Sequence, residues 1–239
     1  MQKTKKPAME QFDQFAKSYD ELLRDPIRDV FSGRGAAFFH ERKRDLIRDW
    51  FRRRRRSTQQ LSYLDVGCGK GELLSLLQKD FERVSGCDPS EEMLAEADCA
   101  VTQRQTDSTK IPFADSSFDF VTAVCVYHHV PPDLRDSLTR DIVRVLRPGG
   151  FFSIIEHNPW NPATRIIVSR TPVDADAILL PARESMNRLR NAGLRIAGCE
   201  YFLYFPEALY RYLGRTESLM RSLPFGGQYA VFAEKPPAK

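Results

Sequence analysis

The stretch Leu64-Asp-Val-Gly-Cys-Gly-Lys-Gly71 determines the fold of this chain. An apolar strand runs into three glycines spaced G-x-G-x-G, and a helix follows at once. A dinucleotide-binding loop needs the spacing G-x-G-x-x-G, but position 72 is a glutamate, and no Gly-Lys-Ser/Thr follows as in a P-loop. The glycines let a ligand lie against bare backbone beside the Asp65 carboxylate. A ligand with a cationic amino-acid end fits this loop, and a plain tight turn is the alternative.

Strand and helix segments alternate on both sides of this loop. We expect strands at 61–66, 83–88, 101–105, 118–125, 151–156, 194–205 and 228–234, and helices at 11–23, 36–55, 72–79, 91–97, 134–146, 182–191 and 207–219. This alternation predicts a parallel sheet with helices on both faces.

A proline-rich stretch at 157–180 interrupts the alternation, and its length indicates a functional cap. We expect a single domain. Its parts are a helical lid at 1–57, a cofactor-binding core at 58–157, a cap insertion at 158–180, and the rest of the sheet at 181–239.

Two further acidic positions follow the second and third predicted strands. Asp88 closes the second strand, where a carboxylate can accept both hydroxyls of a ribose. Thr106-Asp-Ser108 follows the third strand, where Asp107 can accept from the amino group of an adenine; a simple turn residue is the alternative. With the glycine loop, these sites occur in the order that one adenosine lying across the strand ends requires.

Several motifs carry a family resemblance. They are Leu64-Asp-Val-Gly-Cys-Gly-Lys-Gly71, Cys87-Asp-Pro-Ser90, Ile111-Pro-Phe-Ala-Asp-Ser-Ser-Phe-Asp119, Tyr127-His-His-Val130, Leu146-Arg-Pro-Gly-Gly150 and the leader Phe15-Ala-Lys-Ser-Tyr-Asp20. Together they resemble the class I S-adenosylmethionine-dependent methyltransferases of the ubiquinone/menaquinone-biosynthesis-like group. The resemblance implies an α/β fold: a doubly wound, seven-stranded, mostly parallel sheet with the last strand antiparallel, the Rossmann-like methyltransferase fold, with a short cap.

The resemblance also implies S-adenosylmethionine as the cofactor and a role for each matching residue. Tyr19 would lie over the cofactor, and its methionine part would be bordered by Asp65, Gly67 and Gly69. Asp88 would bind the ribose, with Pro89 and Met93 beside it. Asp107 and Ser108 would bind adenine, and the Cys125 carbonyl would face the amino group.

Histidines are the candidate catalytic residues. Methyl transfer from a sulfonium is an in-line displacement, and an oxygen acceptor must also lose a proton, for which histidine is the usual base. His128 and His129 follow the fourth strand and His157 follows the fifth, so all three fall at the ligand-binding edge. We expect His129 or His157 to be the base, with activity rising through pH about 6 to 7. One of the adjacent pair is expected to be structural, and His40 to be a surface residue.

The segment after the fourth strand restricts the acceptor. It reads Cys125-Val-Tyr-His-His129, not the Asn/Asp-Pro-Pro-Tyr of enzymes that methylate amide or exocyclic amino nitrogens. No Pro-Cys nucleophile occurs, and no carboxylate appears there before Asp133, so we expect no metal. Aromatic residues in the cap and at 201–225 favour an apolar pocket or a face for a lipid-linked substrate. The prediction is a small-molecule acceptor methylated at oxygen or carbon.

The charge pattern leaves a second candidate function. The net charge is +4, but Arg52 to Arg56 are five arginines in succession. A solvated helix end explains the run, and an RNA methyltransferase steered by residues 52–56 is the alternative. An inactive cofactor-binding partner subunit is a third interpretation, against which the complete glycine loop argues.

Cysteine usage and hydropathy predict the compartment. The chain has five cysteines, an odd number, with no C-x-x-C pair. No apolar run is long enough for a bilayer, and no charged-then-apolar leader opens the sequence. Reduced thiols in a cytoplasmic protein are therefore expected.

Overall fold

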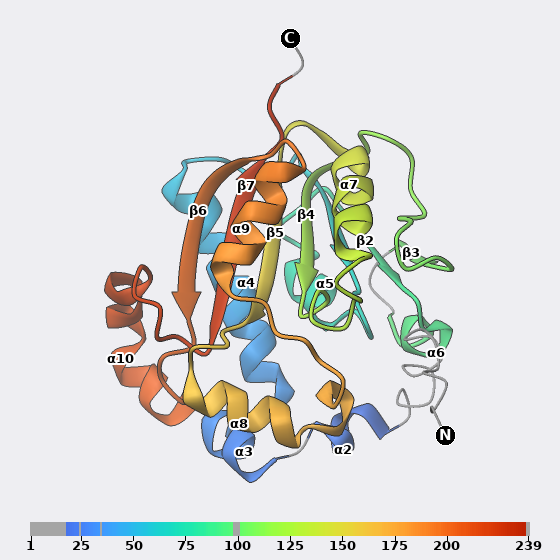
Figure 1. Cartoon of the computed structure of the whole chain (residues 1–239). Coiled ribbons are helices and arrows are strands. Elements are labelled where there is room, and N and C mark those ends of the chain that lie inside the picture. Colours follow the sequence, from blue (N-terminus) through green and yellow to red (C-terminus); the bar gives the residue numbers. More distant parts are fainter. Residues whose placement is uncertain (1–17, 24, 34, 98–100, 238–239) are drawn as a thin grey trace, which may run out of the picture.

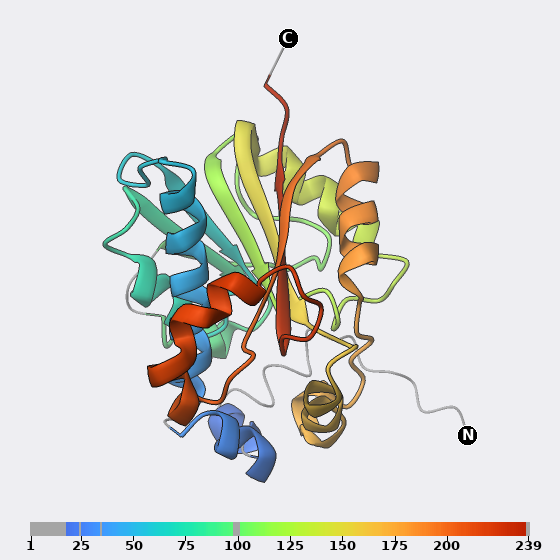
Figure 2. The same cartoon turned by 90° about the vertical axis from the view of Figure 1, so that its left-hand side faces the viewer.

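A seven-stranded sheet lies at the centre of the molecule (Figures 1 and 2). The computed structural model describes residues 18–23, 25–33, 35–97 and 101–237 of the chain. The strands are β1 (Ser62–Val66), β2 (Arg83–Asp88), β3 (Val101–Arg104), β4 (Phe118–Val124), β5 (Leu146–His157), β6 (Arg195–Phe202) and β7 (Gln228–Glu234). Their order is β3-β2-β1-β4-β5-β7-β6. Neighbours from β3 to β5 pair in parallel, while β7 runs antiparallel to both β5 and β6. The predicted doubly wound sheet with an antiparallel last strand is confirmed.

Helices cover both faces of the sheet (Figure 2). They are α2 (Tyr19–Leu22), α3 (Pro26–Phe31), α4 (Ala36–Arg53), α5 (Glu72–Leu77), α6 (Glu91–Leu94), α7 (Arg135–Val145), α8 (Pro162–Arg170), α9 (Ala182–Asn191) and α10 (Glu207–Met220), with a 3₁₀ turn, η2, at Pro172–Asp174. Two apolar cores result. One packs α7 and α9 against the sheet, and the other packs α4 and α5 against the opposite face.

Helix α4 is anchored by one tryptophan. Trp50 is 1 % exposed, and its ring stacks on Phe232 of β7 with the centroids 3.8 Å apart. Such pairs contribute about 0.5–1.5 kcal/mol beyond the buried area. A Cβ at position 198 would lie 2.8 Å from the Trp50 ring, so this contact needs Gly198 on the adjacent strand β6. The C-terminal half of α4 is thereby fixed to the sheet, and its N-terminal half extends beyond the strand ends.

Small differences from the predicted boundaries have local causes. Strand β5 begins at Leu146, five residues before the predicted Phe151, because Leu146 already pairs with Phe118 of β4 across a register shift. Helix α4 ends at Arg53, two residues earlier than predicted. Most of the predicted helix at 11–23 lies outside the described residues.

The parallel strands end at one edge of the sheet, where α2, α3 and α8 lie (Figure 1). Helix α3 contacts α8, and α2 contacts η2. Among the described residues, no helix combines the length and the apolar character needed to cross a membrane. The cysteines that the structure describes (Cys68, Cys87, Cys125 and Cys199) are free thiols.

Candidate active site

A cleft opens at the carboxyl ends of the strands, between the sheet and the helices α3, α4 and α8. The strand order reverses between β1 and β4, and ligands of such sheets bind at this reversal. Ten of the predicted site residues line the cleft: Asp65, Gly67, Gly69, Asp88, Pro89, Met93, Ser108, Cys125, His129 and His157. Asp107 does not line it, and the Tyr19 side chain lies outside the described residues.

The glycine loop adopts a backbone that other residues rarely reach. Gly67, Gly69 and Gly71 have φ values of 72°, 54° and 77°, in the left-handed region. A Cβ at Gly67 would lie 2.5 Å from a Val126 methyl, whereas one at Gly69 would meet nothing within 4 Å. The loop therefore presents bare backbone to the cleft at Gly69, as the sequence predicts for a closely approaching ligand.

The Asp88 carboxylate is fixed by backbone donors. Its Oδ2 accepts from the Gly69 amide and its Oδ1 from the Ser90 amide, both at 2.9 Å. Ser90 in turn caps α6, accepting from the Met93 amide at 3.2 Å. These two backbone bonds fix the orientation of the Asp88 carboxylate at the end of β2.

Asp65 is buried at the start of the loop, with 3 % of its surface exposed. Its Oδ1 accepts from the Thr122 hydroxyl at 2.5 Å, and that hydroxyl lies 2.7 Å from the Tyr63 hydroxyl. Burial raises the pKa of Asp65 to about 7. Its charge therefore changes near neutral pH, and a cationic ligand would favour the ionised form.

Asp107 forms a turn in this structure. Its Oδ1 accepts from the amide and the hydroxyl of Thr109, both at 2.8 Å, and these bonds lower its pKa. Ser108 and Gln105 line the cleft here instead. Binding of adenine by Asp107 stays a prediction, and Gln105 is a lining residue that the sequence analysis missed.

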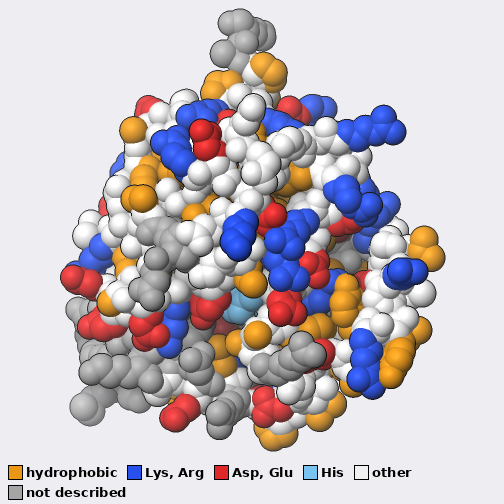
Figure 3. Space-filling model, turned by 180° about the vertical axis from the view of Figure 1, so that it is seen from behind, with side chains coloured by type: hydrophobic (Ala, Val, Ile, Leu, Met, Phe, Trp, Pro, Cys, Tyr) orange, Lys and Arg blue, Asp and Glu red, His pale blue; other side chains and the backbone are white. Residues whose placement is uncertain are grey.

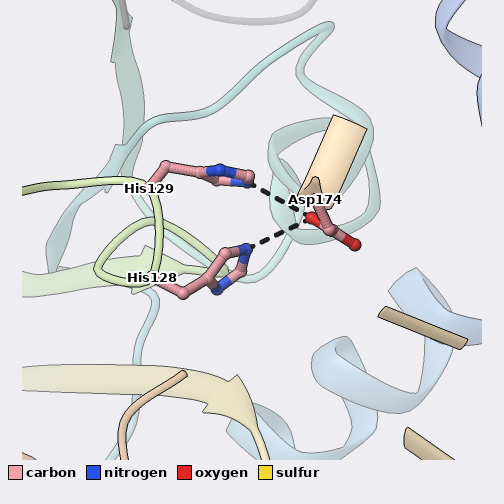
Figure 4. Close-up of side chains that lie close together, drawn as sticks. All are labelled: His128, His129 and Asp174. Atoms are coloured by element: carbon pink, nitrogen blue, oxygen red, sulfur yellow. Dashed lines mark ion pairs between the residues drawn. The ribbon is translucent and has the colours of Figure 1, made fainter. Parts of the chain in front are cut away.

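The two adjacent histidines both lie close to Asp174 of the cap (Figure 4), and His128 also contacts Glu156 of β5. His128 is 2 % exposed, and its Nδ1 lies 2.5 Å from Oε2 of the fully buried Glu156. The other oxygen of Glu156 accepts from the Tyr127 amide at 2.7 Å. Asp174 Oδ1 lies 3.5 Å from Nε2 of both His128 and His129. The geometry fits His128 as the structural member of the pair.

These surroundings separate the pKa values of the three histidines. Burial lowers the pKa of His128, but Glu156 and Asp174 outweigh it and raise that pKa well above the usual value. Burial, reinforced by the charge of His128, lowers the pKa of His129 to about 3 and that of His157 to about 4. Both are therefore neutral at pH 7 and have a lone pair for a proton, but pKa values this low make them weaker bases than a solvated histidine. These pKa values lie below the range of pH 6 to 7 in which we expected activity to rise, because that range is typical of a solvated histidine.

The His157 ring lies beside a cysteine sulfur and a glutamine amide. Its Nε2 lies 3.8 Å from the Cys125 sulfur, and its Nδ1 lies 3.4 Å from Nε2 of Gln228. Gln228 also lies 3.5 Å from the Cys125 sulfur and lines the cleft. The side chain of Cys125 thus faces His157.

Helix α4 contributes residues that the sequence analysis missed. His40 is half-buried and lines the cleft, so the expectation of a surface histidine was wrong. Lys43 is 6 % exposed and also lines the cleft. Its position could have been found, because Lys43 lies four residues after Phe39 and seven before Trp50, on the apolar face of the helix.

The arginine run is mostly bound to the protein itself. Arg53 pairs with Asp49 and Glu200, the Arg54 guanidinium lies 3.0 Å above the Trp50 ring, and Arg56 donates to the Gly149 carbonyl at 3.3 Å. None of the five arginines lines the cleft. On the face shown in Figure 3, basic and acidic side chains lie next to each other, and a histidine is visible in a hollow.

The expected aromatic pocket does not form from the residues proposed for it. Trp160, Tyr212 and Phe225 are 71 %, 70 % and 66 % exposed. The apolar part of the cleft comes instead from Phe31 and Phe39, with aliphatic side chains such as Ile167 and Leu203.

Known proteins resemble this chain over the same region. Residues 64–154 match the family model described as a methyltransferase domain. The 27-O-demethylrifamycin SV methyltransferase of Amycolatopsis mediterranei is 26 % identical over 205 residues, 72 % of each chain. The ubiquinone/menaquinone biosynthesis C-methyltransferase of Desulfotalea psychrophila is 33 % identical over 111 residues, 44 % of each chain.

Solved structures show the same fold. The S-adenosylmethionine-dependent methyltransferase of Archaeoglobus fulgidus superposes with a TM-score of 0.61 at 20 % identity, over 84 % of this chain and 100 % of that one. Except for the rifamycin methyltransferase, the first curated relatives match this chain over about half of their own length or less.

Proposed function

Because this chain carries a class I S-adenosylmethionine-dependent methyltransferase domain of the ubiquinone/menaquinone-biosynthesis type, we propose that it methylates a small-molecule acceptor at oxygen or carbon. One observation carries the proposal. A single cleft is lined by the glycine loop and Asp88 on one side and by the neutral histidines His129 and His157 on the other. Cofactor and proton acceptor would thus share one space.

The cofactor would lie across the strand ends. Its methionine part would border Asp65 and the loop from Gly67 to Gly69, its ribose hydroxyls would bind Asp88, and its adenine would lie beside Ser108, all of which line the cleft. Catalysis then requires the acceptor atom about 3 Å from the methyl carbon, in line with the breaking carbon–sulfur bond. A hydroxyl acceptor would lose its proton to His129 or His157.

The nature of the acceptor is supported by the cleft and by relatives. The apolar wall of Phe31 and Phe39 suits a hydrophobic organic molecule. The names of the two relatives above refer to a rifamycin and to quinones, methylated at oxygen and at carbon respectively. The arginine run lies before β1, at the end of the sheet opposite the cleft, and most of it is paired, so it does not favour RNA.

Asp88→Ala is expected to weaken S-adenosylmethionine binding by about 2–4 kcal/mol, since two ribose hydroxyls lose their acceptor at about 1–2 kcal/mol each. This corresponds to a Kd about 30- to 900-fold higher, measured by titration calorimetry. Asp133→Ala removes an exposed carboxylate outside the cleft and should leave the Kd unchanged. Equal affinities of wild type and Asp88→Ala would show that the ribose lies elsewhere.

Cofactor affinity should also depend on pH through Asp65. Burial raises the pKa of this carboxyl to about 7, so the neutral form dominates below that pH. If the cationic end of the cofactor binds the ionised form, the Kd tightens by up to about tenfold per unit as pH rises toward 7 and levels off above it. Asp65→Asn should bind more weakly and lose this dependence. A flat profile for the wild type would place the cationic group away from Asp65.

A further inference from the structure

Three possible ligand atoms converge on the wall of the cleft. Nε2 of His128, Nε2 of His129 and a carboxylate oxygen of Asp174 all lie within 4.8 Å of one another. The histidines come from the loop after β4, and Asp174 comes from η2 in the cap, with all three side chains pointing toward one another (Figure 4). All three residues line the cleft.

We propose that His128, His129 and Asp174 bind a divalent transition-metal ion. With metal–ligand bonds of about 2.1 Å, two ligands of a tetrahedral site lie about 3.4 Å apart. The Asp174 oxygen lies close to this spacing from both histidine nitrogens, at 3.5 Å, and the two nitrogens lie within 4.8 Å of each other. Two histidines and one carboxylate are a ligand set suited to zinc, iron, manganese or cobalt.

The position of His128 supports this proposal. Its Nε2 is buried and accepts or donates no hydrogen bond among the described residues, and its ion-pair partner, the Asp174 oxygen, lies at 3.5 Å. Its Nδ1 is held at 2.5 Å by Glu156, and a carboxylate on the far nitrogen is the usual support of a metal-bound imidazole. Donation from Nδ1 to Glu156 leaves the lone pair of Nε2 directed at the proposed ion.

Charge balance points the same way. Glu156 is fully buried and the side chain of Asp174 is 11 % exposed, so two carboxylates share a nearly dry region. A divalent ion bound beside them would offset both negative charges.

The proposal goes beyond methyl transfer, because it concerns an ion bound independently of the cofactor. Three protein ligands leave at least one position open for water or an oxygen atom of an acceptor. His157 would then be the histidine left to accept a proton.

The test is titration of the metal-free, tag-free chain with Co²⁺ in the absence of cofactor. The wild type should bind one equivalent and develop the visible absorption bands of a four-coordinate cobalt site. Asp174→Asn and His129→Ala should each raise the Kd for Co²⁺ at least about tenfold, since the loss even of a supporting residue costs 10- to 100-fold. His157→Ala, which removes a histidine of the same cleft outside the cluster, should stay within about threefold.

Absence of saturable cobalt binding by the wild type would overturn the proposal, as would variants at positions 129 and 174 that bind like the wild type. Circular dichroism checks folding, and Asp174→Asn, which keeps the shape of the side chain, decides the matter if His129→Ala does not fold. Calorimetry with S-adenosylmethionine on the same protein separates this inference from the proposed function, because the proposed function requires cofactor binding and the metal site does not.

Discussion

His157→Ala or His129→Ala, whichever removes the base, is expected to lower turnover by about 10²- to 10⁴-fold while cofactor affinity stays within a few-fold. A hydroxyl acceptor must lose its proton as the new bond forms, and a positioned base contributes that factor. Both side chains line the cleft and are neutral at pH 7, because burial lowers their pKa values to about 3 and 4. If the proposed metal is bound, His129→Ala acts through loss of the ion, and His157→Ala through loss of the base.

Turnover requires an acceptor, which can be found by incubating a small-molecule extract with the chain and labelled cofactor and analysing it by mass spectrometry. The formation of S-adenosylhomocysteine then gives the rate. His40→Ala is the matched control, because His40 also lines the cleft but lies on α4, away from the cluster. Full turnover by both the His129 and the His157 variants would exclude histidine catalysis. Methylation by proximity alone, or of an already activated carbon, would then be the mechanism.

Glu156→Ala is expected to lower the free energy of unfolding by about 3–5 kcal/mol, the cost of removing one partner of a buried ion pair. Glu156 is fully buried, lies 2.5 Å from His128 and accepts from the Tyr127 amide at 2.7 Å. The alanine variant leaves a buried imidazolium and a buried amide without this acceptor.

Urea unfolding followed by circular dichroism measures this effect. The control is Glu91→Ala, which breaks an exposed pair with Arg104 and should cost less than about 1 kcal/mol. Glu156→Gln keeps an acceptor for the Tyr127 amide and should lie between the wild type and Glu156→Ala. Similar stabilities of Glu156→Ala and Glu91→Ala would mean that Glu156 does not hold His128 in place.

The sheet could be predicted from the sequence because its signals are local. Short stretches of sequence are enough to recognise the strand that leads into Gly67 and the alternation of strands and helices after it. The same holds for helix α9, which has its predicted bounds. The site could be predicted only in part. Asp88 lines the cleft because it ends a strand at the ligand edge, and any strand order of this class places it there.

The remaining site residues depend on contacts between distant segments. Asp174 reaches His129 only because the cap folds back over the strand ends, and nothing in its neighbourhood indicates a ligand. The pKa values of the histidines depend on Glu156 and on burial, which are three-dimensional properties. The arginine run was open to two interpretations until its partners, such as Glu200 on β6, were visible.

A crystal structure of the chain with S-adenosylhomocysteine tests the central claim most directly. We expect the ligand in the cleft, its amino-acid end at Asp65 and Gly69, its ribose hydroxyls on the Asp88 carboxylate, its adenine beside Ser108, and its sulfur on the side of His129 and His157. A ligand bound away from the ends of β1 and β2, or a cleft that stays empty at saturating ligand, would contradict the account.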